Sequence, residues 1–220
     1  MGRSGRQTKI GFRMFASVLA AAFAVLCLSG CSGEFKDKSV VDAAKKSGMN
    51  ELSTAEFERH MSGGSFRIAD DDIETDRSPA YYVSENSDTA NSLYAKHFKL
   101  DDSDIPGLEE FIACADEGRG FSLICFRTVS VESAKKLFAG WTEFIKDDMV
   151  CYSGSKSGYD YTLGYYKSQS GEDTEYCECV YIKGKTVILL DSMLSGSYDR
   201  KTLDTFTKEL GLVLPEAAKK

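Results

Sequence analysis

The first thirty residues constrain the rest of the chain most strongly, because they have the order of an export leader. Four basic residues come first: Arg3, Arg6, Lys9 and Arg13. An apolar run of 15 residues follows, from Met14 to Leu28, with Ser17 as its only polar residue. A membrane-spanning helix needs roughly 20 apolar residues, so this run is too short for a permanent anchor. The pattern is typical of a signal peptide, and we expect the folded part to begin after residue 30.

The end of the leader reads Leu28-Ser29-Gly30-Cys31, which resembles the lipobox of bacterial prolipoproteins. In that class an aliphatic residue and two small residues precede a cysteine that receives a diacylglycerol thioether, and a dedicated signal peptidase cleaves before it. The resemblance implies that Cys31 carries acyl chains such as palmitate and holds the protein on the extracytoplasmic face of the cell membrane. Several chains are expected there, because one chain alone anchors only marginally. The alternative is an ordinary secretory signal with a cysteine near its cleavage site.

The charge of the remaining chain restricts its partners. Removal of residues 1–30 removes four basic residues and no acidic ones, so the net charge changes from −7 to −11. Nucleic-acid binding depends on clusters of Lys and Arg, and we therefore expect no nucleic-acid partner. Anionic lipid headgroups would also repel such a surface, so the lipid on Cys31 would have to provide the attachment to the membrane.

Composition and turn signals divide the exported part into segments. We expect a lipidated cysteine and polar tether over residues 31–38 and a single α+β domain over residues 39–214. An insertion that contains two acidic runs is expected within this domain, over residues 70–104. A charged tail is expected over residues 215–220. Neither acidic run has the glycine and glutamate spacing of a calcium loop, so both are expected to be solvated loops.

Several local patterns predict helices. Ser53-Thr54-Ala55-Glu56 is a capping box that starts a helix reaching about Met61. Ser130 is placed to cap a second helix with an apolar stripe, in which the lone Trp141 is expected in the core. The stripe consists of Ala134, Leu137, Phe138, Trp141, Phe144 and Ile145. Asp199 is placed to cap the last helix, which ends at Gly211.

Alternating and β-branched segments predict strands. Residues 109–115 and 121–129 form one expected hairpin, and residues 175–182 and 186–191 form another. Residues 159–167 read as a half-buried strand, whereas residues 149–158 read as a Gly/Ser loop.

These elements predict an α+β domain with a mostly antiparallel sheet and helices packed on one face. Their order also suggests a duplicated helix-strand-hairpin unit, with one copy at Ser53–Val129 and the other at Val131–Asp191.

The side chains that carry chemistry do not form a recognisable catalytic or metal motif. Five thiols remain besides Cys31, and their favoured role is that of small buried hydrophobes, with one disulfide left open. They are Cys114, Cys125, Cys151, Cys177 and Cys179. The two histidines, His60 and His97, are not accompanied by a nucleophile elbow or a Gly-rich phosphate loop. We therefore expect no enzyme, no metal and no cofactor, with a carboxylate-based hydrolase as the less favoured alternative.

Tyrosines in the second half suggest a binding role. Exposed rings stack on sugars, so a glycan or small-ligand binder is one reading, and the expected contacts are Tyr159, Tyr161, Tyr165 and Tyr166. The favoured interpretation is a protein-interaction module at the cell surface, with a cell-envelope protein as partner. The alternative to a ligand role is that the alternating tyrosines simply face the core.

The chain also resembles a family of uncharacterised small lipoproteins of Gram-positive gut bacteria. The segments that carry the resemblance are the lipobox, the helix start Leu52–Phe57, the junction Phe126–Phe138, the hairpin Ile182–Val187 and the closing Leu210-Gly211. Residues 81–98 depart from the pattern. The resemblance implies a lipid-anchored α+β domain, and it brings no activity or binding residue to carry over.

Overall fold

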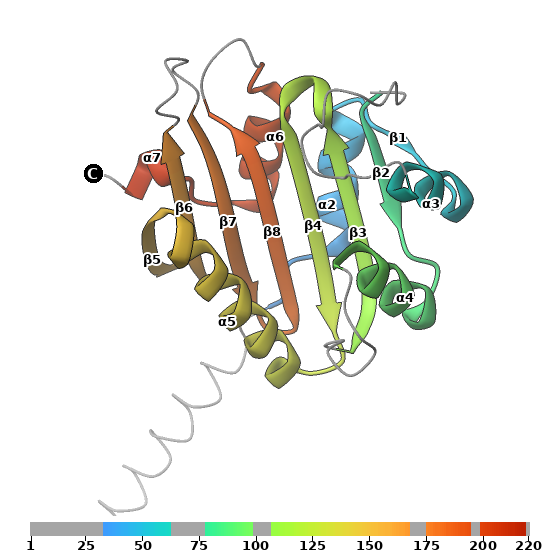
Figure 1. Cartoon of the computed structure of the whole chain (residues 1–220), viewed down its shortest axis with the longest axis horizontal. Helices are drawn as coiled ribbons and strands as arrows, with labels where there is room; N and C mark the ends of the chain where they lie inside the picture. The colour runs from blue at the N-terminus through green and yellow to red at the C-terminus, as the bar shows by residue number, and fades with distance from the viewer. Residues whose placement is uncertain (1–32, 63–77, 99–106, 168–174, 195–198, 219–220) are drawn as a thin grey trace, which may run out of the picture. The chain divides into compact units, whose positions relative to one another are not determined.

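An eight-stranded sheet organises the described part of the chain (Figure 1). The computed structural model describes residues 33–62, 78–98, 107–167, 175–194 and 199–218. The strands are β1 (Asn50–Glu51), β2 (Ala80–Val83), β3 (Leu108–Asp116), β4 (Phe121–Thr128), β5 (Val150–Lys156), β6 (Tyr159–Lys167), β7 (Glu175–Lys183) and β8 (Thr186–Met193).

The strand order is β1-β2-β3-β4-β8-β7-β6-β5, so each half of the chain contributes four strands in sequence order. The halves meet where β4 pairs with β8. β1 and β2 are parallel, and the other described pairs are antiparallel. The predicted α+β class, the mostly antiparallel sheet and both hairpins are therefore confirmed. The two halves have the same strand pairing only in their last three strands. Their first strands differ, because a helix connects β1 to β2 whereas β5 and β6 form a hairpin.

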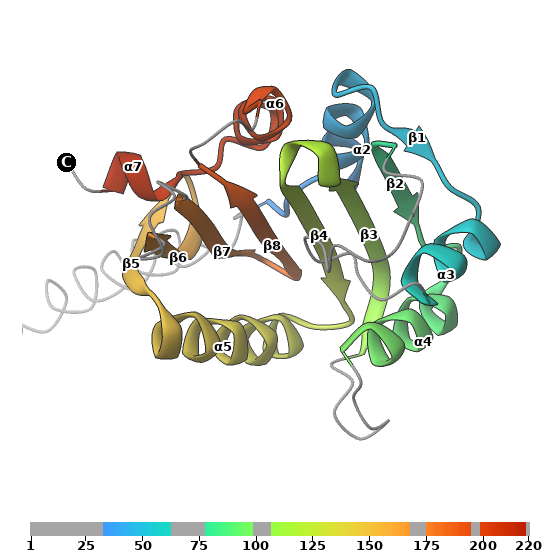
Figure 2. The ribbon, with the colours of Figure 1, turned by 45° about the horizontal axis from the view of Figure 1, so that its top comes forward.

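Helices cover both faces of this sheet (Figure 2). They are α2 (Asp37–Lys46), α3 (Thr54–Ser62), α4 (Ser87–Phe98), α5 (Val131–Asp148), α6 (Lys201–Leu210) and the short α7 (Pro215–Ala218). α2 and α6 lie on one side, and α3, α4 and α5 lie on the other. The prediction that the helices pack on one face is therefore wrong.

Two hydrophobic cores explain this arrangement. In β4, Leu123 and Cys125 belong to a first core, which includes Phe206 of α6. The intervening Ile124 and Phe126 belong to a second core, under α3, α4 and α5. A strand that is apolar at consecutive positions must be covered on both faces. β4 and β8, which lie at the centre of the sheet, both have this property. A prediction of helices on one face would leave half of their apolar side chains uncovered.

The predicted insertion at 70–104 contributes directly to the sheet and the core. β2 lies between β1 and β3, and Tyr81 and Tyr82 point into the first and the second core respectively. Ala90 and Leu93 of α4 are also buried in the second core. Residues 78–98 are therefore part of the domain framework. The two acidic runs of this segment lie outside the described residues.

Two predicted helix starts and one predicted helix end are confirmed, whereas Asp199 is not the N-cap of α6: Arg200 holds that position, and the Asp199 carboxylate accepts from the Lys201 backbone N–H at 3.0 Å. The Ser53 backbone N–H donates to Glu56 Oε2 at 2.8 Å, and the Ser53 hydroxyl donates to the same oxygen at 2.6 Å. The Ser130 hydroxyl accepts from the Ser133 backbone N–H at 3.0 Å at the start of α5. Gly211 ends α6 with φ +67°, in the left-handed region that glycine tolerates.

The segment predicted as a Gly/Ser loop is largely a strand. β5 pairs with β6 from Val150↔Tyr165 to Lys156↔Tyr159. Ser157 and Gly158 form the two-residue turn, with φ of 51° and 78°. Serine and glycine have low β propensity, and the strand forms here because a regular neighbour is available to pair with it.

Both ends of the domain are more ordered than the sequence predicts. Phe35, expected in the tether, is only 7% exposed, and α2 begins two residues after it. Pro215, expected to start a tail, begins α7, and Arg200 donates to both carboxylate oxygens of Glu216 at 2.7 and 3.1 Å.

α5 approaches the sheet closely over Gly164. A Cβ atom on this residue would lie 2.5 Å from Ile145 Cγ2, 2.7 Å from Met149 Sδ and 2.8 Å from the Glu178 carbonyl oxygen. Any larger residue would force the end of α5 away from β6 and β7. The absence of a side chain at Gly164 therefore allows the C-terminal end of α5 to pack directly on the sheet before β5 begins.

Candidate functional site

The lipobox residues Leu28, Ser29, Gly30 and Cys31 lie outside the described residues. The described chain is first fixed to the domain core at Phe35, four residues after Cys31. The Phe35 ring lies 5.5 Å from the Tyr159 ring, between centroids, and the Lys183 ammonium lies 5.9 Å from the Phe35 centroid. The folded domain therefore begins almost immediately after the expected lipidation position.

A small cleft lies beside this entry point. It has a volume of about 210 Å³, and its wall includes Phe35, Tyr159, Lys183 and Glu209. Glu209 also forms an ion pair with Lys46, with Lys46 Nζ 2.6 Å from Glu209 Oε2. Ligand sites usually enclose roughly 300–1,000 Å³, and this cleft is smaller and carries both charge signs. Its chemistry selects no class of ligand.

The four tyrosines predicted as ligand contacts do not form one surface. Tyr159 is 3% exposed, and its hydroxyl donates to the Gly211 carbonyl at 2.9 Å, so it is a core residue. Tyr161 and Tyr165 are half-buried on the same face of β6, against the first core. Tyr166 is 40% exposed, and alternation along the strand places it on the opposite face. The structure therefore places Tyr159, Tyr161 and Tyr165 on one face of β6, with the Tyr159 and Tyr161 ring centroids 6.1 Å apart, but Tyr159 is buried and Tyr166 lies on the opposite face.

Their hydroxyls also differ. A hydrogen bond to the Glu175 carboxylate, together with burial, raises the pKa of Tyr165 to about 12. Burial raises the pKa of Tyr159. Tyr161 extends across Gly154 of the neighbouring strand, where a Cβ atom would lie 2.6 Å from the Tyr161 hydroxyl oxygen. The Tyr161 hydroxyl thus lies over β5.

A cluster of charged residues at the start of α2 was not predicted. Arg127 Nη1 donates to Asp37 Oδ2 at 2.9 Å, and Arg127 Nη2 lies 2.8 Å from Glu110 Oε2. Burial, followed by the neighbouring Asp37 carboxylate, raises the pKa of Glu110 to about 7, although Arg127 opposes this shift. The three residues lie far apart in the sequence, so no local pattern could have shown that they meet.

The described cysteines are free thiols. Four of them, Cys114, Cys125, Cys177 and Cys179, are buried in the first core, and Cys151 is partly buried. Burial raises the pKa of Cys114 and Cys125, which keeps these thiols protonated and unreactive. The preferred prediction, small buried hydrophobes, describes these four residues well. Within the described segments, no three His, Cys, Asp or Glu side chains form a group that could hold a metal ion.

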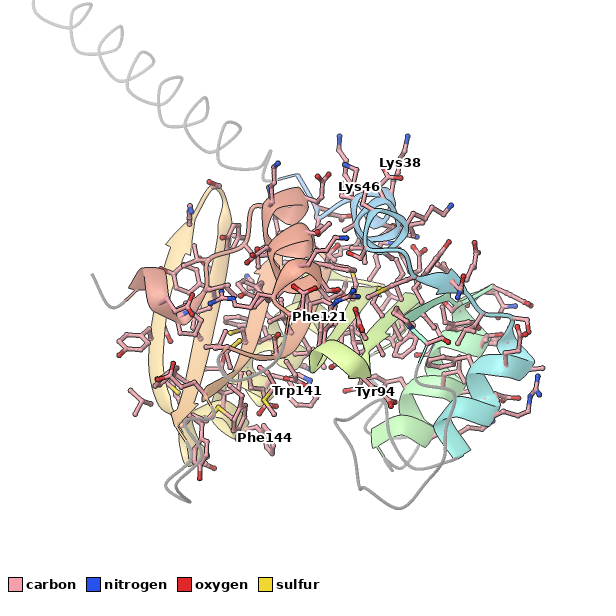
Figure 3. All side chains as sticks on the ribbon, turned by 90° about the horizontal axis from the view of Figure 1, so that it is seen from above. Lys38, Lys46, Tyr94, Phe121, Trp141 and Phe144 are labelled. Atoms are coloured by element: carbon pink, nitrogen blue, oxygen red, sulfur yellow. The ribbon has the colours of Figure 1, made fainter. Side chains whose placement is uncertain are left out.

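The C-terminal half of α5 carries two aromatic side chains at the edge of the second core. Trp141 is partly buried against the second core, whereas Phe144 is 43% exposed, and their rings make an edge contact at 5.5 Å. Figure 3 shows this pair on the side of the sheet opposite Lys38 and Lys46 of α2. Trp141 is therefore a core-edge residue, whereas Phe144, which belongs to the predicted apolar stripe of this helix, is exposed.

The two edges of the sheet differ in length. β1 ends the sheet with two residues, whereas β5 ends it with seven. Among the described residues, β5 pairs only with β6, and no other backbone group bonds to it. The exposed side of β5 is the longest run of unpaired strand backbone in the described part of the chain.

Comparison with known proteins does not assign a family. No protein-family model matches the chain, and no curated protein matches it. None of the helices in the described segments has both the length and the apolar composition needed to cross a membrane.

Proposed function

We propose that this chain is a membrane-anchored extracytoplasmic lipoprotein whose domain acts as a binding or protein-interaction module at the cell surface. The leader and the lipobox support the anchor. The structural observation that carries the proposal is the burial of Phe35 four residues after Cys31. A domain that begins so soon after the lipidation position has little freedom to leave the membrane surface.

The length of the connection defines which part of the domain would be held near the bilayer. Four residues span at most about 14 Å when fully extended. Phe35 contacts Tyr159, at the turn between β5 and β6, and Lys183, at the turn between β7 and β8. Acyl chains on Cys31 would therefore hold these two turns close to the membrane.

A binding role is favoured over turnover by the position of the unusual carboxyl group. Glu110 has a pKa near neutrality, as an acid catalyst requires, but it is held by Arg127 and does not line the cleft beside Phe35. A glycan role is less favoured than a protein-interaction role, because Tyr159 is buried and Tyr166 lies on the other face from Tyr161.

Lipidation of Cys31 can be tested by substitution. We expect the Cys31→Ala variant to lose incorporation of labelled palmitate and to leave the membrane fraction after a carbonate wash. Cys151→Ala is the matched control, because this thiol lies within the domain, and it should remain lipidated and membrane-bound. Retention of the Cys31→Ala variant in washed membranes would show that the anchor lies elsewhere.

A further inference from the structure

The exposed edge of β5 differs from the edges that proteins usually protect. Natural sheets limit edge pairing with short edge strands, prolines, bulges or charges along the edge. β1 follows this rule, with two residues. β5 has seven residues in continuous register with β6, contains no proline, and carries its one charged side chain, Lys156, at its last position.

The hairpin turn determines which backbone groups of β5 face outward. In a hairpin with a two-residue turn, the residues that flank the turn exchange both backbone hydrogen bonds, and this alternates along the strand. Lys156 and Tyr159 flank the Ser157-Gly158 turn. Lys156, Gly154 and Tyr152 therefore bond inward to β6. The outward N–H and C=O groups belong to the alternate residues, which are Cys151, Ser153 and Ser155.

The two faces beside this edge have different side chains. On one face, the half-buried Tyr152 lies next to Gly154, which the Tyr161 ring crosses. This is an aromatic surface with a phenol hydroxyl at the strand edge. On the other face, Ser153 and Ser155 are exposed. An added strand would meet an apolar neighbour on one side and polar neighbours on the other.

We infer that the β5 edge binds an extended segment of a partner protein by strand addition, with apolar residues against Tyr152 and Tyr161 and polar residues beside Ser153 and Ser155. A row of alternating outward N–H and C=O groups is matched by another extended polypeptide, which lengthens the sheet by one strand. This inference rests on the proposed binding role and deepens it, and its binding test does not require the lipid on Cys31.

A second copy of this chain fits the edge less well. Each exported chain has a net charge of −11, so two copies repel each other. Antiparallel pairing of β5 with itself would also turn one domain upside down relative to the other. The Phe35 ends would then lie at opposite ends of the pair, and four-residue tethers could not reach the same membrane.

The test begins with random nonapeptides displayed on phage and selected on immobilised residues 32–220. All described core residues lie at or after Phe35, so this fragment contains both cores. We expect enriched peptides that alternate apolar and polar residues and lack a central proline. On addition of the synthetic peptide, hydrogen exchange should slow at the amides of Cys151, Ser153 and Ser155.

Substitution at Ser153 separates backbone pairing from side-chain contact. Ser153→Pro removes an outward N–H and leaves the β6 bonds intact, so the peptide affinity should fall by about 10-fold or more. Ser153→Ala keeps the N–H and should change the affinity by less than about 2-fold. Peptides N-methylated on alternate residues repeat the test on the unaltered protein. Methylation of the set that faces β5 should abolish binding, whereas methylation of the other set should not.

Several results would overturn this inference. They are failure to enrich any peptide, equal affinity of the Ser153→Pro and Ser153→Ala variants, and protection confined to the Trp141–Phe144 face or to the Phe35 cleft. Dimerisation of the free fragment that Ser153→Pro abolishes would assign the edge to a second copy. Because the fragment carries no lipid, these outcomes are independent of the Cys31→Ala experiment.

Discussion

At the scale of single residues, the unusual group is Glu110. Its carboxyl group shares Arg127 with Asp37, the first residue of α2, and lies with 18% of its side chain exposed. One guanidinium cannot fully compensate two adjacent, poorly hydrated carboxylates, so folding favours the protonated form of one of them. The cluster thereby links the protonation of Glu110 to the attachment of α2 to the sheet.

This linkage predicts a pH dependence of stability. The folded pKa of about 7 exceeds the ordinary 4.5, so the folded state binds the proton more tightly. The stabilisation is fully present below about pH 4.5 and is lost as the pH rises through about 7. We expect the free energy of unfolding contributed by this group to fall by about 1–3 kcal/mol between pH 5 and pH 8.

Urea unfolding at several pH values measures this effect. Glu110→Gln should flatten the profile between pH 5 and pH 8, because the amide does not titrate. Glu143→Gln, at an exposed position in α5, is the matched control and should retain the wild-type slope. Parallel profiles for wild type and Glu110→Gln would contradict the assignment.

At the scale of elements, α5 connects β4 to β5, and so joins the first four strands of the chain to the last four, and it covers the second core. Ala134, Leu137 and Ile145 are buried, and Trp141 packs at the border of this core. Phe144 lies one turn further out and is exposed. The predicted apolar stripe therefore faces the second core as expected, except that Phe144 is exposed.

The two neighbouring aromatic residues should respond differently to truncation. Trp141→Ala removes contacts with the second core and should lower the free energy of unfolding by about 2–4 kcal/mol. Phe144→Ala removes an exposed ring and should lower it by less than about 1 kcal/mol. Denaturant midpoints at constant m-value give both numbers. A larger loss for Phe144→Ala would reverse the assignment of the helix face.

At the scale of the whole domain, the β4–β8 pairing joins the two halves into one sheet with shared cores. The first core contains Leu123 from the first half and Leu190 from the second, and α2 packs against α6 over it. Neither half can bury its apolar surface without the other. Residues 34–220 accordingly form a single compact unit.

We therefore expect residues 32–220 to unfold in one cooperative transition. Trp141 fluorescence reports on the second core and far-UV circular dichroism reports on the whole sheet, so the two curves should coincide. Leu190→Ala, in the first core, should shift both curves together and cost about 2–5 kcal/mol. Separate transitions, or a shift of only one probe, would indicate two independent units.

The sequence alone determined the features that depend on neighbours a few residues away. The Ser53–Glu56 capping box, the Ser130 cap, the Gly211 helix end and both apolar hairpins were predicted because their partners are close along the chain. Hydrogen bonds of this range form wherever the local backbone allows them, so the pattern is sufficient evidence.

Only the tertiary structure decided which segments meet. It placed β2 inside the sheet, made a strand of residues 150–156, covered both sheet faces, and brought Asp37, Glu110 and Arg127 together. It also buried Tyr159 and left one edge of β5 without a strand partner among the described segments. These outcomes depend on pairing between strands distant in sequence and on the burial of apolar surface, which is non-directional and leaves no local signature in the chain.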